Sequence, residues 1–180
     1  MITSNRSSAD DSDAARFMKN IELVLFQRHL AEAEDGDAGA MTSVGMHYAS
    51  DTGVDQDGEE AIRWLRKAVD LGNVEAMGCL AAMYAVGEEV IQDHKEAFMW
   101  WRKAADLGDA DAMFALGVHY TFGHGVIQDN VKAYAWSHTA GAKGQKKADE
   151  LCEMLTKAMT PEQIAEGQKR SREIMKSISP

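Results

Sequence analysis

Hydrophobic and polar positions follow a helical spacing along this chain, and that spacing is itself repeated. Ala61, Trp64 and Ala68 stand at positions i, i+3 and i+7, which places them on one face of an α-helix. The same set recurs 36 residues later around Trp100. A fixed period of this length is typical of stacked helical repeats, so the pattern predicts an array of helix pairs.

Three copies of the repeat align without a gap, over residues 37–72, 73–108 and 109–144. Each copy is expected to hold a first and a second helix. The first helices are predicted over Ala40–Ser50, Ala76–Val86 and Ala112–Phe122, and the second helices are predicted to begin at Asp57, Asp93 and Asp129. Aspartate is a good N-cap, because its carboxylate accepts the free backbone N–H groups of the first turn. The columns that define the repeat are Tyr48, Tyr84, Tyr120, Trp64, Trp100, Trp136, Gly72, Gly108 and Gly144.

The segments outside the three copies are predicted to be a tail and helical caps. Residues 1–11 are rich in Ser and Asp and predict a disordered acidic tail. Residues 12–36 predict a capping helix in the second-helix place of a degenerate preceding repeat, because Gly36 lies 36 positions before Gly72. Residues 145–180 predict two C-terminal capping helices, the last from Pro161 to about Lys176. Residues 12–180 are thus expected to form a single solenoid domain.

The copies share the motif Ala-x(3)-Leu/Val-Gly/Ala-x(2)-Tyr, then Val-x-Gln-Asp, then Ala-x(2)-Trp-x(2)-Lys-Ala-Ala-x(2)-Gly. Over about 110 residues this motif resembles the Sel1-like repeat. The resemblance implies an all-α fold, a right-handed superhelical solenoid of antiparallel helix pairs similar to tetratricopeptide arrays. It also implies a non-catalytic adaptor that needs no cofactor. In such stacks the first helices line the concave face.

Positions on the first helices that differ between copies are candidates for a protein-binding groove. A column under packing constraint repeats, whereas one that meets a partner can vary. The candidates are Thr42, Met46, Gly78, Ala82, Phe114, Val118 and Phe122. Phe114, Phe122 and Trp101 are larger than the residues in their own columns, which suits anchors for a bound segment. The alternatives are that small residues permit tight curvature and that the aromatics fill space against the terminal helices.

Charge supports a protein partner and argues against nucleic acid and membrane surfaces. The formal net charge of −10 repels phosphates and anionic headgroups. The second helices carry most of the charge, and the first helices as predicted carry none. The first helices are therefore either buried on nearly all sides or partly exposed as an apolar surface.

The histidines do not form a recognisable metal or catalytic motif. His47 and His119 share a column in which the middle copy has Met83. Stacked helices lie about 8–10 Å apart, so two repeats separate these imidazoles by about 20 Å, too far to share one ion. His119, His124 and His138 lack the local spacing of a ligand pair. We therefore expect no metal site.

Other candidate chemistry has structural explanations. The pair Asp55 and Asp57 could suggest calcium, but the recurrent aspartate is explained as a helix cap. Cys79 and Cys152 occupy different columns and are expected to be reduced, mostly buried residues. No phosphate loop, serine-nucleophile motif or Cys-x-x-Cys pair occurs. We expect no catalytic and no cofactor-binding residue.

The function expected from these observations is binding of a peptide or protein segment in the concave groove. One alternative is a homo-oligomeric structural protein, such as a homodimer. Another is hydrolysis of β-lactams, as suggested for cysteine-rich relatives of the family, but those carry a cysteine pair in each unit. The first residues, Met1 to Ala15, lack the apolar core of a signal peptide. A cytoplasmic location is expected, or a periplasmic one if the natural start is missing.

Overall fold

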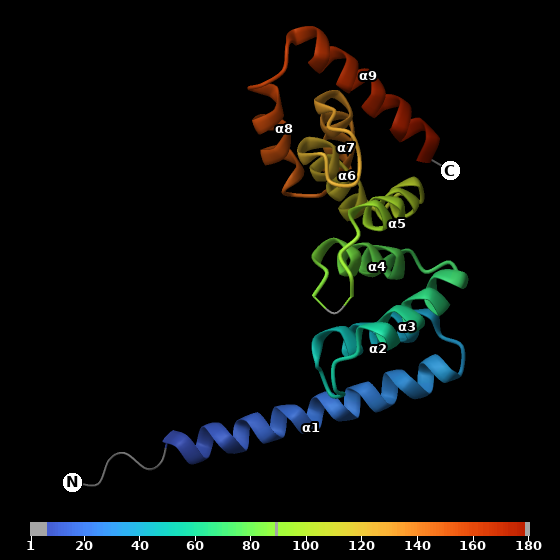
Figure 1. Ribbon diagram of the computed structural model, residues 1–180, viewed down its shortest axis with the longest axis vertical. Helices are drawn as coiled ribbons and strands as arrows, with labels where there is room; N and C mark the ends of the chain where they lie inside the picture. The colour runs from blue at the N-terminus through green and yellow to red at the C-terminus, as the bar shows by residue number, and fades with distance from the viewer. Residues whose placement is uncertain (1–6, 89, 179–180) are drawn as a thin grey trace, which may run out of the picture. The chain divides into compact units, whose positions relative to one another are not determined.

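The computed structural model describes residues 7–88 and 90–178, and within them every regular element is an α-helix (Figure 1). The helices are α1 (Ser7–Glu34), α2 (Ala38–Ser50), α3 (Gly58–Asp70), α4 (Val74–Val86), α5 (His94–Asp106), α6 (Ala110–Phe122), α7 (Asn130–Ala142), α8 (Ala148–Thr156) and α9 (Pro161–Ile178). The predicted all-α class is confirmed, and the three predicted pairs are α2 with α3, α4 with α5, and α6 with α7.

The helices pack into two compact units, divided in the sequence between Asn73 and Val74. In the N-terminal unit, α2 packs against both α1 and α3. In the C-terminal unit, α4 to α7 each pack against the next helix, and α8 and α9 both pack against α7. A single domain over residues 12–180 stays a prediction.

Aspartate caps begin the helices. The carboxylates of Asp57 and Asp93 each accept two backbone N–H groups, and that of Asp129 accepts one, at the starts of α3, α5 and α7. Asp37 and Asp109 do the same for α2 and α6, which begin two residues before the predicted starts. The first helices therefore include the charged residues Glu75 and Asp111, so the prediction that they carry no charge was wrong for their first turns.

Glycine ends each second helix with a left-handed residue. Gly36, Gly72, Gly108 and Gly144 have φ between 83° and 98°, a region that side chains disfavour. The residue after each glycine donates its backbone N–H to a carbonyl in the preceding turn, for example Asn73 to Ala68 at 3.0 Å. This Schellman-type closure satisfies carbonyls at the helix end and turns the chain into the next first helix.

Helix α1 packs where a second helix of a repeat would lie, and its residues correspond to those of α5, 72 positions later in the sequence. Phe26 meets the ring of Tyr48 edge-on at 5.6 Å, as Phe98 meets Tyr120 at 5.4 Å. The carbonyl of Glu22 lies against Gly53 as that of His94 lies against Gly125. These matched contacts show that α1 packs on α2 as α5 packs on α6; the assignment of α1 to a degenerate repeat stays a prediction.

Helix α1 is also longer than predicted. It spans 28 residues, against 13 in α5, and in Figure 1 its N-terminal part extends beyond α2. The predicted disordered tail over 1–11 therefore overlaps α1 from Ser7 to Asp11, while residues 1–6 lie outside the described part. A helix can continue into polar sequence without a packing face of its own once a docked segment has nucleated it.

Alanine columns let the helices approach closely. Ala61, Ala97 and Ala133 have no accessible surface, so the adjacent helix packs directly against the backbone there. In the tryptophan column, Trp136 is buried. The ring of Trp64 is covered by Lys67, whose Nζ atom lies 3.8 Å from the ring centroid. The indoles thus fill space between helices, and in the first two copies a lysine ammonium group lies over the face of the ring.

We expect Asp51→Gly to stabilise the protein. Asp51 ends α2 with φ of 53°, where the equivalent Gly87 and Gly123 have 74° and 72°. Glycine removes the strain of the left-handed backbone but raises the conformational entropy of the unfolded chain. The first effect should be larger, so the free energy of unfolding should rise by about 0.5 kcal/mol. Urea unfolding followed by circular dichroism measures it. Asp51→Ala is the control and should lower stability; a loss with glycine equal to that with alanine would contradict the strain argument.

Candidate protein-binding surface

The predicted groove residues differ widely in accessibility. Thr42 is only 3 % exposed, and its hydroxyl donates to the carbonyl of Ala38 at 3.0 Å. It is therefore a packing residue, and its assignment to a binding groove is corrected. Met46, Ala82 and Phe122 are exposed. The remaining candidates, Gly78, Phe114 and Val118, are half-buried.

One pair of column departures is explained by packing. A Cβ atom at Gly78 would lie 3.4 Å from the indole of Trp101. The missing side chain on α4 therefore makes room for the large ring on α5, which is half-buried. Trp101 thus fills space between α4 and α5 of its own repeat, and not against the terminal helices as the alternative interpretation expected.

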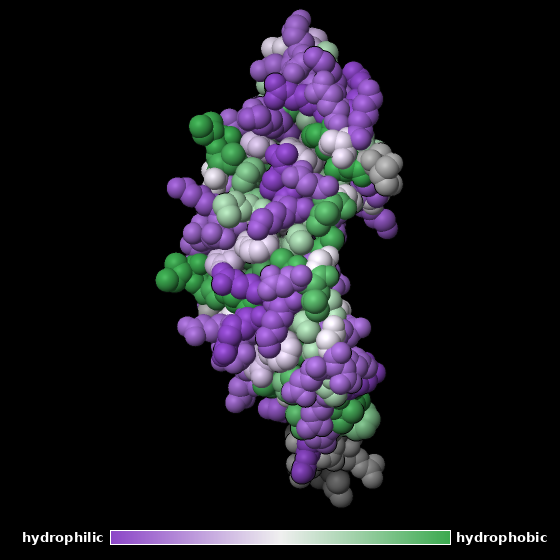
Figure 2. Space-filling model, turned by 90° about the vertical axis from the view of Figure 1, so that its right-hand side faces the viewer, coloured by the Kyte–Doolittle hydropathy of each residue, from purple (hydrophilic) through white to green (hydrophobic). Residues whose placement is uncertain are grey.

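The structure shows an exposed hydrophobic row that sequence reasoning missed. It lies at the turns from first to second helix in the C-terminal unit, and we call it the apolar turn edge. It consists of Val86, Ile91, Phe122 and Ile127. Ile91 is 91 % exposed and Ile127 is 87 % exposed. Figure 2 shows that hydrophobic side chains also reach the surface between polar ones on the face that it displays.

The turns that carry the two isoleucines are tied to the first helices. Asp93 donates its backbone N–H to the carbonyl of Tyr84 at 2.9 Å, and Asp129 does so to Tyr120 at 3.0 Å. The side-chain amide of Gln92 also donates to the carbonyl of Ala85 at 2.8 Å. These bonds fix the backbone that follows each isoleucine. The sequence contained one signal that these positions are exposed. The first copy has the charged residue Asp55 where the other two copies have Ile91 and Ile127.

Three histidines gather where α5 meets the α6–α7 turn. The ring of His94 stacks on that of His124 with centroids 4.9 Å apart, and the centroid of the His119 ring lies 6.2 Å from that of His94 and 6.0 Å from that of His124. The Nδ1 atom of His119 donates to the carbonyl of His124 at 2.8 Å. Sequence spacing did not reveal this cluster because His94 comes from the preceding repeat. Across residues 7–88 and 90–178, no group of three or more side chains has the arrangement to hold a metal ion.

His138 stands apart from that cluster, on α7 beside α9. Its Nδ1 atom lies 3.1 Å from the hydroxyl of Ser171, which is also 2.9 Å from the hydroxyl of Thr139. Ser171 is 2 % exposed, so a substrate has no access to its oxygen. The Ser171–His138 contact therefore joins two helices and does not present a nucleophile.

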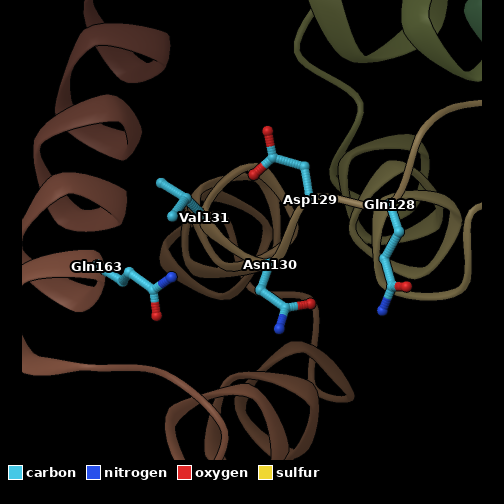
Figure 3. Close-up of a pocket in the computed structure, with 5 residues that line it drawn as sticks. All are labelled: Gln128, Asp129, Asn130, Val131 and Gln163. Carbon is cyan, nitrogen blue, oxygen red and sulfur yellow. The ribbon is translucent and has the colours of Figure 1, made fainter.

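A polar depression lies between the start of α7 and the start of α9 (Figure 3). Its lining residues are Gln128, Asp129, Asn130, Val131 and Gln163. Asp129 is the ionisable member, and its carboxylate already accepts the backbone N–H of Lys132 at 3.0 Å. The depression therefore lacks a pair of ionisable groups that could transfer a proton.

The two cysteines are free and half-buried. Burial raises the pKa of Cys79 to about 11, with a smaller contribution from Glu75. Burial likewise raises the pKa of Cys152 to about 11, helped by Asp149. Few thiolates form at neutral pH under these conditions.

We expect both cysteines to react slowly with iodoacetamide at pH 7.5. A pKa of about 11 in place of 9.0 reduces the thiolate fraction about 100-fold, and alkylation should slow similarly. Mass spectrometry of timed samples measures the rate, and the same protein in urea supplies the control. Alkylation of the native protein as fast as in urea would contradict this expectation.

We also expect acid to destabilise the C-terminal unit through His119. Burial lowers the pKa of His119 from its ordinary 6.5, and His124 and His94 lower it further, against the hydrogen bond to the His124 carbonyl. The native state then binds fewer protons than the unfolded chain, so stability falls as the pH drops below about 6.5. Urea unfolding at pH 7.5 and 5.5 measures the loss.

His119→Met tests the origin of that loss, because Met83 fills the same column in the preceding repeat. The variant should lose less stability than the wild type between the two pH values. Phe98→Leu is the matched control, since Phe98 also packs against His119 but does not titrate. An equal loss in wild type and His119→Met would remove His119 as the cause.

No helix in the described part of the chain combines the length and apolar character needed to cross a membrane.

Comparisons with known proteins agree with this architecture. The chain is 35% identical to a Sel1 repeat protein from Oxalobacter formigenes, over 71% of this chain and 96% of that one, with a TM-score of 0.62. It is 28% identical to c5321, a protective antigen of uropathogenic Escherichia coli with an SLR fold, at a TM-score of 0.78. That match covers 86% of this chain but only 33% of the antigen, so the chain spans about a third of its length.

A more distant likeness is to Helicobacter pylori cysteine rich protein B, with 18% identity, coverage of 82% and 98% and a TM-score of 0.53, which supports the fold alone. A search of curated proteins found no match. The model of the Sel1 repeat matches residues 38–73, 74–109 and 110–145, one residue beyond the predicted boundaries. The chain is an all-α solenoid that belongs to the Sel1 repeat family.

Proposed function

We propose that the chain is a non-catalytic adaptor that binds an apolar segment of another protein on the apolar turn edge. Sel1 repeat proteins generally mediate protein–protein interactions. The observation that carries the proposal is the near-complete exposure of Ile91 and Ile127 at equivalent places in consecutive repeats. A single exposed apolar residue is ordinary, but a repeated set on ordered backbone is typical of an interaction site.

The spacing of the edge suits a short segment. Consecutive stacked repeats should place equivalent residues about 10 Å apart. About seven residues of a helix or three of a strand cover that distance. Full burial of an isoleucine contributes about 2 kcal/mol, so two isoleucines and Phe122 would supply anchors for a specific complex.

The predicted groove and the apolar turn edge share Phe122, the last residue of α6. Ala82 on α4 is exposed, and Phe114 and Val118 on α6 are half-buried. These three remain candidates for the flank of the same site. Met46 belongs to the N-terminal unit and is a separate candidate.

We expect the double variant Ile91→Asp/Ile127→Asp to lose its partner. Two charges on the edge would have to be desolvated on binding, so affinity should fall at least tenfold. Affinity capture from a lysate of the source cell, read by mass spectrometry, compares the variants with the wild type. Circular dichroism should remain unchanged, because both side chains are exposed.

Leu107→Asp is the matched control for this experiment. Leu107 is another exposed hydrophobic residue of the same unit, at the turn that follows α5, and its variant should retain the partner. Val118→Asp tests the predicted groove separately. A double variant that captures the same proteins as the wild type, or a wild type that captures none above background, would overturn the apolar turn edge as the binding site.

A second candidate function is self-assembly through α1. The middle part of α1 exposes an apolar stripe of Phe17, Met18, Ile21 and Val24, whose spacing places it on one helix face. Two such stripes could bury each other in a homodimer. Light scattering over a range of concentrations, with Phe17→Lys/Val24→Lys as the disrupting variant, tests this; a wild type that stays monomeric at high concentration contradicts it.

A further inference from the structure

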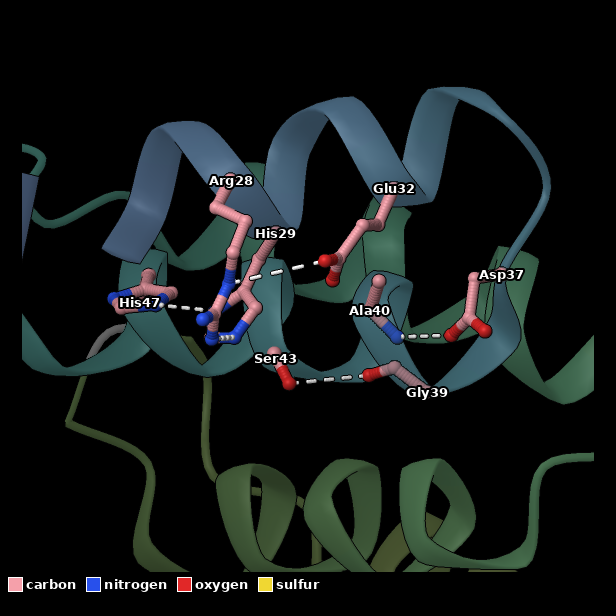
Figure 4. Close-up of polar contacts among 8 residues, drawn as sticks. All are labelled: Arg28, His29, Glu32, Asp37, Gly39, Ala40, Ser43 and His47. Carbon is pink, nitrogen blue, oxygen red and sulfur yellow. Dashed lines mark hydrogen bonds and ion pairs between the residues drawn. The ribbon is translucent and has the colours of Figure 1, made fainter. Parts of the chain in front are cut away.

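Two histidines connect α1 to α2 through a continuous chain of hydrogen bonds (Figure 4). His29 on α1 places its Nδ1 atom 3.0 Å from the Nε2 atom of His47 on α2. The other nitrogen of His29 lies 3.2 Å from a guanidinium nitrogen of Arg28. The other nitrogen of His47 lies 2.6 Å from the carbonyl oxygen of Thr52 and 3.0 Å from its hydroxyl. All four imidazole nitrogens therefore have partners.

These partners fix the position of each proton. A carbonyl oxygen only accepts, so the Nδ1 atom of His47 carries a hydrogen; a guanidinium only donates, so the Nε2 atom of His29 is bare. The hydrogen of neutral His29 is then on Nδ1, from which it is donated to the bare Nε2 atom of His47. The link between the helices is thus a hydrogen bond from the Nδ1–H group of His29 to the unprotonated Nε2 atom of His47.

We propose that the His29–His47 pair is an acid-sensitive latch, which holds α1 against α2 at neutral pH and releases α1 when both imidazoles are protonated. The first added proton can enter at Nε2 of His29, at the expense of the contact with Arg28. The second must enter at Nε2 of His47, where it would face the N–H of His29. That step replaces a hydrogen bond by two opposed donors and two like charges.

The surrounding groups oppose protonation. Burial lowers the pKa of His29 most, His47 and Arg28 lower it further, and Glu32 on α1 acts in the opposite direction. On the side of α2, Thr52 is uncharged and Asp51, the C-cap, is exposed. Because the folded pKa lies below the ordinary 6.5, the docked state loses stability as the pH falls below that value.

The packing of α1 allows it to leave without unfolding the rest of the unit. Helix α1 packs mainly against α2, whereas α2 and α3 hold each other through contacts of their own. Its contacts beside the pair include Phe26 against His47, with ring centroids 5.6 Å apart, and the Glu22 carbonyl against Gly53. Local opening of a peripheral helix then costs less than global unfolding.

The latch is specific to this pair of helices. In the C-terminal unit, His119 takes the place of His47 and likewise donates from Nδ1 to the carbonyl five residues on. The residue of α5 equivalent to His29, however, is Trp101. The His119 contact therefore lies within one repeat, and among the described residues the hydrogen bond between two imidazoles on adjacent helices occurs in the N-terminal unit.

Hydrogen exchange measured by mass spectrometry on the full chain tests the proposal. Peptides from α1 over residues 22–33 should lose protection at least tenfold between pH 7.5 and 5.0, after correction for intrinsic exchange rates. Peptides from α3, residues 58–70, serve as the internal reference and should keep theirs. Unchanged protection of α1, or loss in α3 over the same pH range, would overturn the latch.

His29→Gln is the first variant, because its side-chain amide can still donate to His47 but does not take up a proton. Its α1 protection should change less than threefold over the same range. Arg28→Gln and Glu32→Gln form a second test on exposed side chains, where folding is not at stake. Arg28→Gln should move the midpoint of release up by about 0.3 pH unit and Glu32→Gln should move it down by a similar amount. Shifts in the same direction, or none, would contradict the proposal.

Discussion

Close contact between small residues is the constraint on which both units depend. Ala76 and Ala112 in first helices, like Ala61, Ala97 and Ala133 in second helices, have no accessible surface. Alanine at these places lets neighbouring helix axes approach to about 8 Å, and a larger residue would push them apart. Within each unit, the helices of the repeats bury their apolar stripes mainly against helices close in sequence, so this short spacing has to recur in every repeat.

Most of the fold could be predicted because it rests on local signals that occur three times. The cap at Asp93 and the turn at Gly108, for example, each follow from residues within a few positions. The length of α1 could not be predicted in this way. Its N-terminal part follows no repeat column, and its helical conformation continues from the docked half around Phe26, a cooperative effect that composition does not report.

The candidate site was harder to predict, because variation between copies has two physical causes. Gly78 differs from its column because Trp101 on the adjacent helix occupies the space. Ile91 differs from Asp55, its counterpart in the first repeat, although it has almost no neighbour at all. Separating the two cases requires knowing which residue lies opposite. That information is in the packing between helices and not in the alignment of the copies.

The same reasoning explains why a pH-dependent contact suits α1 better than α5. Trp101 buries apolar surface against α4, a contact that does not depend on pH, and α5 has to stay in place for α4 and α6 together. Helix α1 packs mainly against α2, so its release leaves the α2–α3 packing intact. An imidazole pair at His29 and His47 therefore makes the docking of α1 dependent on pH without destabilising the neighbouring repeats.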